Sequence, residues 1–182
     1  MGIVSYSSSK RPTSRSKKAA RPSPSKKNPA SESHGIPPNP YNPHAWIIGN
    51  PKIGKGTWIG AFCLIDGLGG LEIGKGCDIA SGAHILSHST VRRCISERAH
   101  DRVDYAATKI GNYVFIGENA TVLMGAQIGD HSVIGAGAVV TENKVISPYS
   151  LVIGVPGRVV KNLKKEAKRF KRGKPSNKKH TR

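Results

Sequence analysis

Residues 110–156 read IGNYVF IGENAT VLMGAQ IGDHSV IGAGAV VTENKV ISPYSL VIGVP, and a branched aliphatic residue opens every block of six. A period of six fits neither an amphipathic helix nor a hairpin strand, whereas hexapeptide repeats are typical of parallel β-helices. With three blocks to a turn, each opening residue stacks on its counterpart one turn along, about 4.8 Å away. The glycine that often follows permits a tight corner. The stretch therefore predicts an all-β solenoid with a column of Ile and Val as its core.

The same phase begins upstream of this stretch. Blocks open at Ile47, Ile53, Ile59 and Ile65, and again at Ile73, Ile79 and Ile85. The step of eight between the two groups predicts a small bulge at residues 67–70. The step of 25 between Ile85 and Ile110 predicts a loop thrown out of the coil at about residues 90–108. We therefore predict one repeat domain over residues 42–158.

The net charge of +18 lies outside this domain. Residues 1–45 hold eight Lys and Arg against one acid, and residues 158–182 hold twelve against one. Residues 1–41 are rich in Ser, Pro and Lys, so they cannot bury enough apolar surface to offset their ordering entropy, and we predict a disordered basic tail. Residues 159–172 carry apolar side chains at helical spacing, which predicts a helix that caps the core. A second basic tail follows over residues 173–182.

Several functional classes lack their sequence signals. No apolar run approaches the length of a membrane span, and the N-terminus lacks the apolar block of a secretory signal. Three cysteines without a framework spacing indicate a reducing compartment, so we expect a cytoplasmic protein. The sequence has neither a phosphate-binding loop motif nor zinc-finger spacing, and we expect no metal.

Four pieces of the chain resemble the hexapeptide-repeat acyltransferases, which are left-handed parallel β-helix enzymes. These pieces are ILSHS at 85–89, KIGNYVFIG at 109–117, VIGAGAVVT at 133–141 and GVPGRVVK at 154–161. The resemblance covers about residues 42–163 and is closest to small sugar O-acetyltransferases similar to maltose and galactoside acetyltransferase. It implies a left-handed β-helix, acetyl-CoA as co-substrate, a homotrimer, and a role in polysaccharide biosynthesis.

The resemblance also implies that His88, at the start of the loop, is the general base. A hydroxyl group is a weak nucleophile at neutral pH, so an imidazole must take its proton as it attacks the thioester. The ring needs a partner on its other nitrogen, and counting turns across the bulge makes Asp66 the candidate. Backbone donors around Gly125 or Ala126 are expected to stabilise the oxyanion.

The remaining site residues follow from the same resemblance. The positions that match the family's CoA contacts are Glu118, Ala136, Thr141, Glu142, Arg158 and Lys161. Three further residues, His84, Arg92 and His100, lie where they are expected to touch the acceptor, and loop arginines suit a phosphate or carboxylate. We therefore expect acetyl transfer to a hydroxyl or amine of a sugar or nucleotide sugar.

Two alternatives stay open. In the first, the β-helix is an interaction module whose basic tails bind nucleic acid or an anionic surface. The minor one is a zinc enzyme similar to the γ-class carbonic anhydrases, for which His84, His88 and His131 are the available ligands. Their spacing does not match that family. The sequence names neither the acceptor nor the acyl chain length.

Overall fold

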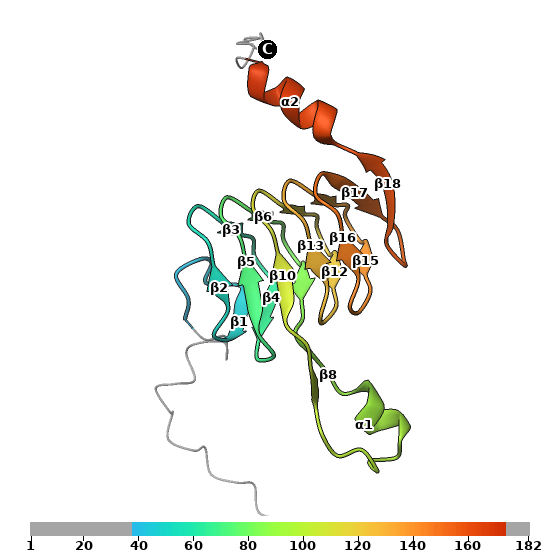
Figure 1. Cartoon of the computed structure of the whole chain (residues 1–182). Coiled ribbons are helices and arrows are strands. Elements are labelled where there is room, and N and C mark those ends of the chain that lie inside the picture. The colour runs from blue at the N-terminus through green and yellow to red at the C-terminus, as the bar shows by residue number, and fades with distance from the viewer. Residues whose placement is uncertain (1–37, 174–182) are drawn as a thin grey trace, which may run out of the picture. The chain divides into compact units, whose positions relative to one another are not determined.

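The computed structural model describes residues 38–173, and these residues form a parallel β-solenoid (Figure 1). Successive short strands lie on three sheets in turn, and each strand pairs in parallel with its counterpart one turn away. The predicted fold class is confirmed. The tail predictions for residues 1–37 and 174–182 lie outside the described residues.

The three sheets are named here A, B and C. Sheet A consists of β1 (Trp46–Gly49), β4 (Leu64–Gly67), β7 (His84–Ile85), β12 (Thr121–Val122) and β15 (Val139–Val140). Sheet B consists of β2 (Lys52–Ile53), β5 (Leu71–Ile73), β10 (Thr108–Ile110), β13 (Gln127–Ile128) and β16 (Val145–Ile146). Sheet C consists of β3 (Trp58–Ile59), β6 (Asp78–Ile79), β11 (Phe115–Ile116), β14 (Val133–Ile134), β17 (Ser150–Ile153) and β18 (Arg158–Asn162).

The core is the predicted aliphatic column. The residues that open the repeats stack in register, as in the pairing of Ile116 with Ile79 on one side and with Ile134 on the other. Because side chains alternate along a strand, the neighbouring residue of each pair faces outward. Most of the opening residues are buried, whereas Ile47 and Ile53, in the first strands, are only partly covered.

The corners between sheets B and C carry a column of aromatic rings. Tyr113, His131 and Tyr149 all have a left-handed backbone, with φ of 55°, 59° and 62°. Their rings stack, with centroids 5.1 Å apart for the first pair and 4.8 Å apart for the second. Stacking contributes energy that helps to hold bulky residues in a conformation that they otherwise avoid.

One segment leaves the coil between β7 and β10 and forms what we call the arm, residues 88–105 (Figure 1). It contains β8 (His88–Ser89), α1 (Val91–Ile95) and β9 (Asp104–Tyr105), and β8 pairs with β9 in antiparallel fashion. The arm lies where the irregular step in the repeat predicts a loop.

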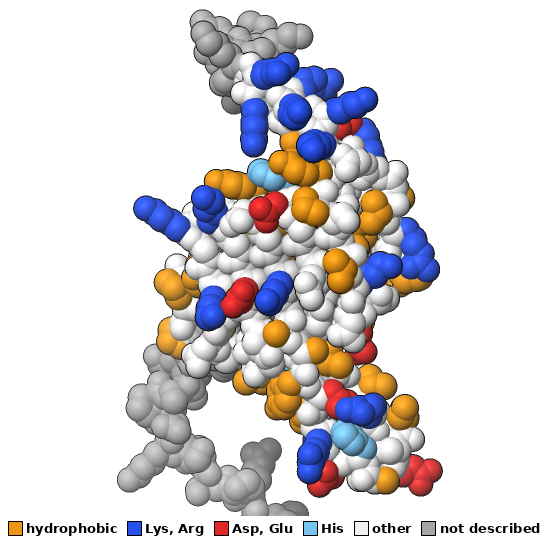
Figure 2. All heavy atoms as spheres, viewed as in Figure 1, with side chains coloured by type: hydrophobic (Ala, Val, Ile, Leu, Met, Phe, Trp, Pro, Cys, Tyr) orange, Lys and Arg blue, Asp and Glu red, His pale blue; other side chains and the backbone are white. Residues whose placement is uncertain are grey.

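The C-terminal segment differs from the prediction. Residues 159–162 were expected to begin a helix, but they belong to β18, which pairs antiparallel with β17. The helix α2 (Lys164–Arg172) starts later and buries none of its residues, so the expected capping contact is not seen among residues 38–173. Figure 2 shows the basic side chains gathered over this helix.

Candidate functional site

The His88 ring and the Asp66 carboxylate meet where the arm leaves the coil. Their Nδ1 and Oδ2 atoms are 2.6 Å apart. Asp66 lies in β4 of sheet A and His88 follows β7, the next strand of that sheet, so the coil itself brings the two together. The Asp66 side chain is fully buried, whereas the His88 side chain is 31% exposed. The ring therefore has a buried partner and an edge accessible to solvent.

The surroundings of Asp66 favour its ionised form. Burial alone raises the pKa of a carboxyl group, but the backbone N–H groups of Ser87 and Leu68 both donate to Asp66, each over 2.9 Å. Together with the His88 ring, these donors hold the Asp66 pKa below its ordinary value. A buried carboxylate of this kind orients an imidazole through Nδ1 and leaves Nε2 free to accept a proton.

The turn beneath this pair is fixed by hydrogen bonds. The Gly69 N–H donates to Ser87 Oγ over 2.8 Å. A Cβ atom at Gly69 would collide with the Ser87 carbonyl oxygen, so only glycine fits there. The buried Thr108 hydroxyl donates to the Leu86 carbonyl over 2.7 Å. The predicted bulge at residues 67–70 thus bonds both to Asp66 and to Ser87, the residue before His88.

The prediction that the backbone N–H groups of Gly125 or Ala126 stabilise the oxyanion is wrong. The Gly125 N–H donates to Thr108 Oγ1 over 3.0 Å and to the Ala106 carbonyl over 3.1 Å. The Ala126 N–H donates to the Leu123 carbonyl over 3.3 Å. Because both groups already have acceptors in the coil, neither points freely toward a substrate.

Arg92 and His100, both assigned to the acceptor from the sequence, lie on the arm around Asp104. Arg92 forms a two-pronged ion pair with Asp104, with Nε and Oδ2 2.9 Å apart. His100 Nε2 lies 3.4 Å from Asp104 Oδ1. The hydrogen bond from Arg92 is the main reason that the Asp104 pKa lies below its ordinary value. The structure therefore gives Arg92 an intramolecular partner.

Tyr105 is a neighbour of His88 that the sequence did not indicate. It lies opposite His88 in the β8–β9 pair, and the two ring centroids are 6.1 Å apart. The ring is 58% exposed. The available signal was an aromatic residue near the end of the predicted loop, but the pairing of β8 with β9 was needed to place it beside His88.

The six residues assigned to CoA do not form one cluster within the chain. Glu118 and Ala136 lie one above the other at the corners between sheets C and A, where the Gly137 N–H donates to the Glu118 carbonyl over 2.8 Å. Thr141 and Glu142 follow β15 and lie at the corner between sheets A and B. The other two are in β18, where Lys161 Nζ pairs with Glu166 over 2.6 Å and Arg158 stands opposite Ile153.

Glu142 also lines a groove of about 330 Å³ beside the arm, together with Arg92, Asp104 and Tyr105. This groove thus brings a residue assigned to CoA next to one assigned to the acceptor.

His84, the last residue assigned to the acceptor, lies on the outer face of sheet A. It is in register with Leu64, which is in register with Trp46, and all three line a groove of about 300 Å³. His84 is exposed, and it is four residues before His88.

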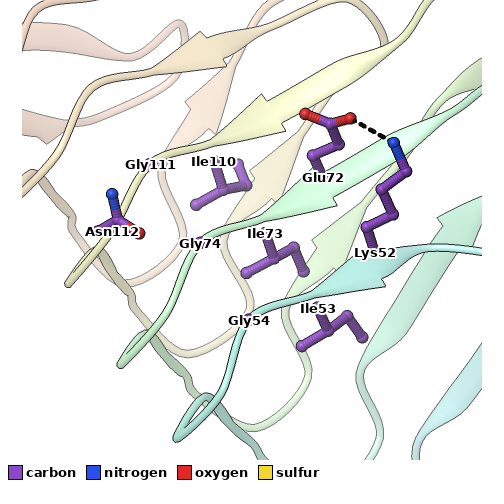
Figure 3. A pocket seen from close by; sticks show the side chains of 9 residues that line it. All are labelled: Lys52, Ile53, Gly54, Glu72, Ile73, Gly74, Ile110, Gly111 and Asn112. Carbon is purple, nitrogen blue, oxygen red and sulfur yellow. Dashed lines mark hydrogen bonds and ion pairs between the residues drawn. The ribbon is translucent and has the colours of Figure 1, made fainter.

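Two larger grooves lie on the outside of sheet B and contain none of the residues assigned to catalysis. One, of about 400 Å³, is shown in Figure 3 and runs over Gly54, Gly74 and Gly111. The Lys52–Glu72 ion pair, 3.0 Å long, stands at its edge (Figure 3). The other, of about 480 Å³, continues over β13 and β16. The larger hollows are therefore separate from the His88–Asp66 pair.

No helix among residues 38–173 combines the length and the apolar character needed to cross a bilayer. Among the same residues, no group of three or more His, Cys, Asp or Glu side chains is placed to hold a metal ion.

Comparison with known proteins finds repeat families and acetyltransferases. The model of the bacterial transferase hexapeptide family (six repeats) matches residues 107–142, and that of the hexapeptide repeat of succinyl-transferase matches residues 52–87. The carnitine operon protein CaiE of Escherichia coli is 26% identical over 72% of this chain and 68% of its own length. The galactoside O-acetyltransferase of Escherichia coli K12 is 43% identical over 34% of this chain, and the match spans 29% of that enzyme.

A solved structure extends the likeness to three dimensions. The hexapeptide-repeat acetyltransferase of Vibrio cholerae O1 biovar eltor, complexed with acetyl-CoA, superposes with a TM-score of 0.55 at 29% identity. The superposition covers 63% of this chain and 61% of that one. The two chains share this fold, but the superposition does not extend over the full length of either protein.

Proposed function

We propose that this chain is a hexapeptide-repeat acyltransferase that transfers an acetyl group from acetyl-CoA to a hydroxyl group of a saccharide, with an amine as the alternative nucleophile. The galactoside O-acetyltransferase relative supports a saccharide acceptor, and the acetyl-CoA complex of the Vibrio cholerae enzyme supports the donor. A nucleotide sugar is included among the candidate acceptors.

The observation that carries this proposal is the contact between His88 Nδ1 and Asp66 Oδ2 at 2.6 Å. Asp66 accepts a hydrogen bond from the Nδ1–H group, which keeps that proton on Nδ1 and leaves Nε2 unprotonated. Nε2 takes the proton of the acceptor hydroxyl as its oxygen attacks the thioester carbonyl carbon. The C–S bond then breaks, the acetyl group stays on the acceptor oxygen, and the imidazolium returns its proton to the departing thiolate. The product pair is an acetyl ester and free CoA.

The proposed CoA site is shared between copies of the chain in a homotrimer, as the family resemblance implies. The six assigned residues lie on two different corners of the coil and on β18, a spread that supports a site built from more than one copy. Arg158 supplies a cation for a CoA phosphate. Lys161 does the same if its contact with Glu166 opens. The thioester of acetyl-CoA supplies the acyl group.

Thiol release from acetyl-CoA, with a pooled panel of sugars, amino sugars and nucleotide sugars, tests the proposal. The wild-type chain should release thiol only when acceptor is present. His88→Ala should lower the rate by roughly 10²–10⁴-fold, the usual contribution of a general base. His131→Asn is the matched control, because His131 lies in the aromatic column and asparagine tolerates its positive φ.

Background release in the wild-type chain, with no rise in melting temperature on adding acetyl-CoA, would contradict the proposal. Full activity in His88→Ala would contradict the assigned base while leaving the transferase intact.

A second candidate function is binding of a polyanion through the C-terminal segment. The helix α2 carries six Lys and Arg, namely Lys164, Lys165, Lys168, Arg169, Lys171 and Arg172, against the single acid Glu166. Fluorescence anisotropy with a labelled oligonucleotide should show binding that weakens steeply between 50 and 200 mM salt, a range over which phosphate contacts lose most of their strength. Absence of binding at low salt would exclude nucleic acid as the partner.

A further inference from the structure

Two exposed aromatic side chains, Trp46 of β1 and Phe62 at the corner before β4, line one groove over the first residues of the sheet A strands. Trp46 and Phe62 are 49% and 72% exposed, and both line the same groove as His84. The groove is completed by His44, Cys63 and Leu64, and no Lys, Arg, Asp or Glu lines it. We propose that Trp46 and Phe62 form a binding platform for an uncharged sugar ring of the acceptor, in an inference that rests on the proposed function.

Phe62 is the least expected of these residues. Its φ is +61°, a left-handed conformation that bulky residues rarely adopt. At the corresponding corners of later turns, the left-handed residues are Gly82, Asn119 and Gly137, all of kinds that tolerate it.

The Phe62 ring has little packing to compensate for this conformation. Tyr113 and Tyr149 each stack on His131, whereas the ring recorded near Phe62 is His44, tilted and 6.1 Å away. Strained backbone conformations of this kind cluster at active sites and ligand-binding sites.

The platform lies on the same face of the sheet as the catalytic pair. Leu64 and Asp66 are two residues apart in β4, so their Cα atoms are about 7 Å apart and their side chains leave the same face. His84 and His88 are four residues apart across the end of β7. A saccharide with one ring on Trp46 and Phe62 thus extends toward the exposed edge of His88.

The lining chemistry selects the class of acceptor. The C–H faces of a pyranose are apolar and pack on aromatic rings, while the two histidines offer polar atoms to its hydroxyl groups. A phosphate or carboxylate finds no Lys or Arg in this groove. The platform therefore favours neutral oligosaccharides over nucleotide sugars.

The chain provides its own reporter, because Trp46 and Trp58 are its only tryptophans. Trp58 is 54% exposed in β3 of sheet C, on another face of the coil, and is a matched control. In Trp58→Phe, emission from Trp46 should change and saturate on titration with one of chitotriose, maltotriose or xylotriose, and UDP-N-acetylglucosamine should be a weaker ligand. In Trp46→Phe, emission from Trp58 should not respond.

Kinetics give the second readout. Phe62→Gly removes the ring and suits a positive φ, so the variant should fold at least as well as wild type. It and Trp46→Ala should each raise the acceptor KM about tenfold, as expected for loss of one stacking contact, with the acetyl-CoA KM unchanged. Trp58→Ala should change neither constant.

The outcomes separate this inference from the proposed function. Acetylation of a saccharide with an unchanged KM in Phe62→Gly overturns the platform and leaves the transferase standing. Saccharide binding at Trp46 without acetyl transfer supports the platform and contradicts the transferase. If sedimentation shows that Trp46→Ala weakens self-association, and no saccharide alters Trp46 emission, the face is an interface between copies and the platform is wrong. If no saccharide is bound or acetylated, both proposals fall.

Discussion

Asp66 and His88 are 22 residues apart in the chain, yet their side chains touch at 2.6 Å because consecutive turns of the coil stack them. The first prediction is that Asp66→Asn lowers kcat for acetyl transfer strongly, by about 100-fold or more. An amide that donates toward Nδ1 favours the tautomer with the proton on Nε2, which cannot act as a base. The rate of thiol release at saturating acetyl-CoA and acceptor measures this kcat. Asp78→Asn, on the outer face of sheet C, is the control and should be fully active.

A second prediction concerns acid stability. The Asp66 pKa is lowered from its ordinary value of 3.8, so the unfolded chain binds a proton at a pH where the folded chain does not. The stability contributed by this group is therefore present above about pH 4 and is lost as the pH falls through the folded pKa. Melting temperatures from pH 6 to pH 3 should fall more steeply for wild type than for Asp66→Asn. Parallel curves would show that Asp66 does not contribute this linkage.

The third prediction is about the aliphatic column. Ile116 is fully buried between Ile79 and Ile134. Ile116→Val should lower the free energy of unfolding by about 0.5–1.5 kcal/mol and Ile116→Ala by about 2–5 kcal/mol, because the narrow coil cannot close the cavity. Val145→Ala, at an exposed outer position, should be nearly neutral. Urea denaturation measures all three, and equal losses at positions 116 and 145 would contradict the assigned core.

A fourth prediction concerns the arm. Asp104 is the shared partner of Arg92 and His100, so Asp104→Asn should loosen the arm without unfolding the coil. Limited proteolysis should then cut within residues 90–103 faster than in wild type. The melting temperature should stay nearly the same, since exposed ion pairs contribute little to global stability. Cleavage at the wild-type rate would show that other contacts hold the arm.

The sequence predicted the repeats and the places where they are interrupted, and it missed the pairing of the C-terminal segment. The phase of six located every coil strand and the arm, because each turn buries its own aliphatic residue regardless of its neighbours. It also predicted the contact between Asp66 and His88, because the two residues lie on neighbouring turns of the coil. It did not predict the antiparallel β18, whose hydrogen bonds to β17 override the helical spacing of residues 159–163.

The oxyanion donors and the partner of Arg92 were also beyond the sequence. Whether the Gly125 N–H is free depends on Thr108, which lies one turn away in space and 17 residues away in sequence. The Arg92–Asp104 pair likewise depends on how the arm folds back on itself.

The last prediction separates two reasons for glycine in this coil. Gly74 has an ordinary φ, but a Cβ there would lie 2.5 Å from the Gly111 carbonyl oxygen of the next turn. Gly137 has a φ of +65° and open space around it. Gly137→Ala should therefore lose only the conformational cost of a left-handed residue, about 1–2 kcal/mol. Gly74→Ala must push two turns of backbone apart and should lose at least the upper end of the usual overpacking cost, about 3 kcal/mol. Urea denaturation of both variants measures the difference, and a Gly74→Ala loss no larger than that of Gly137→Ala would show that the stacked turns yield more easily than their hydrogen-bonded ladders suggest.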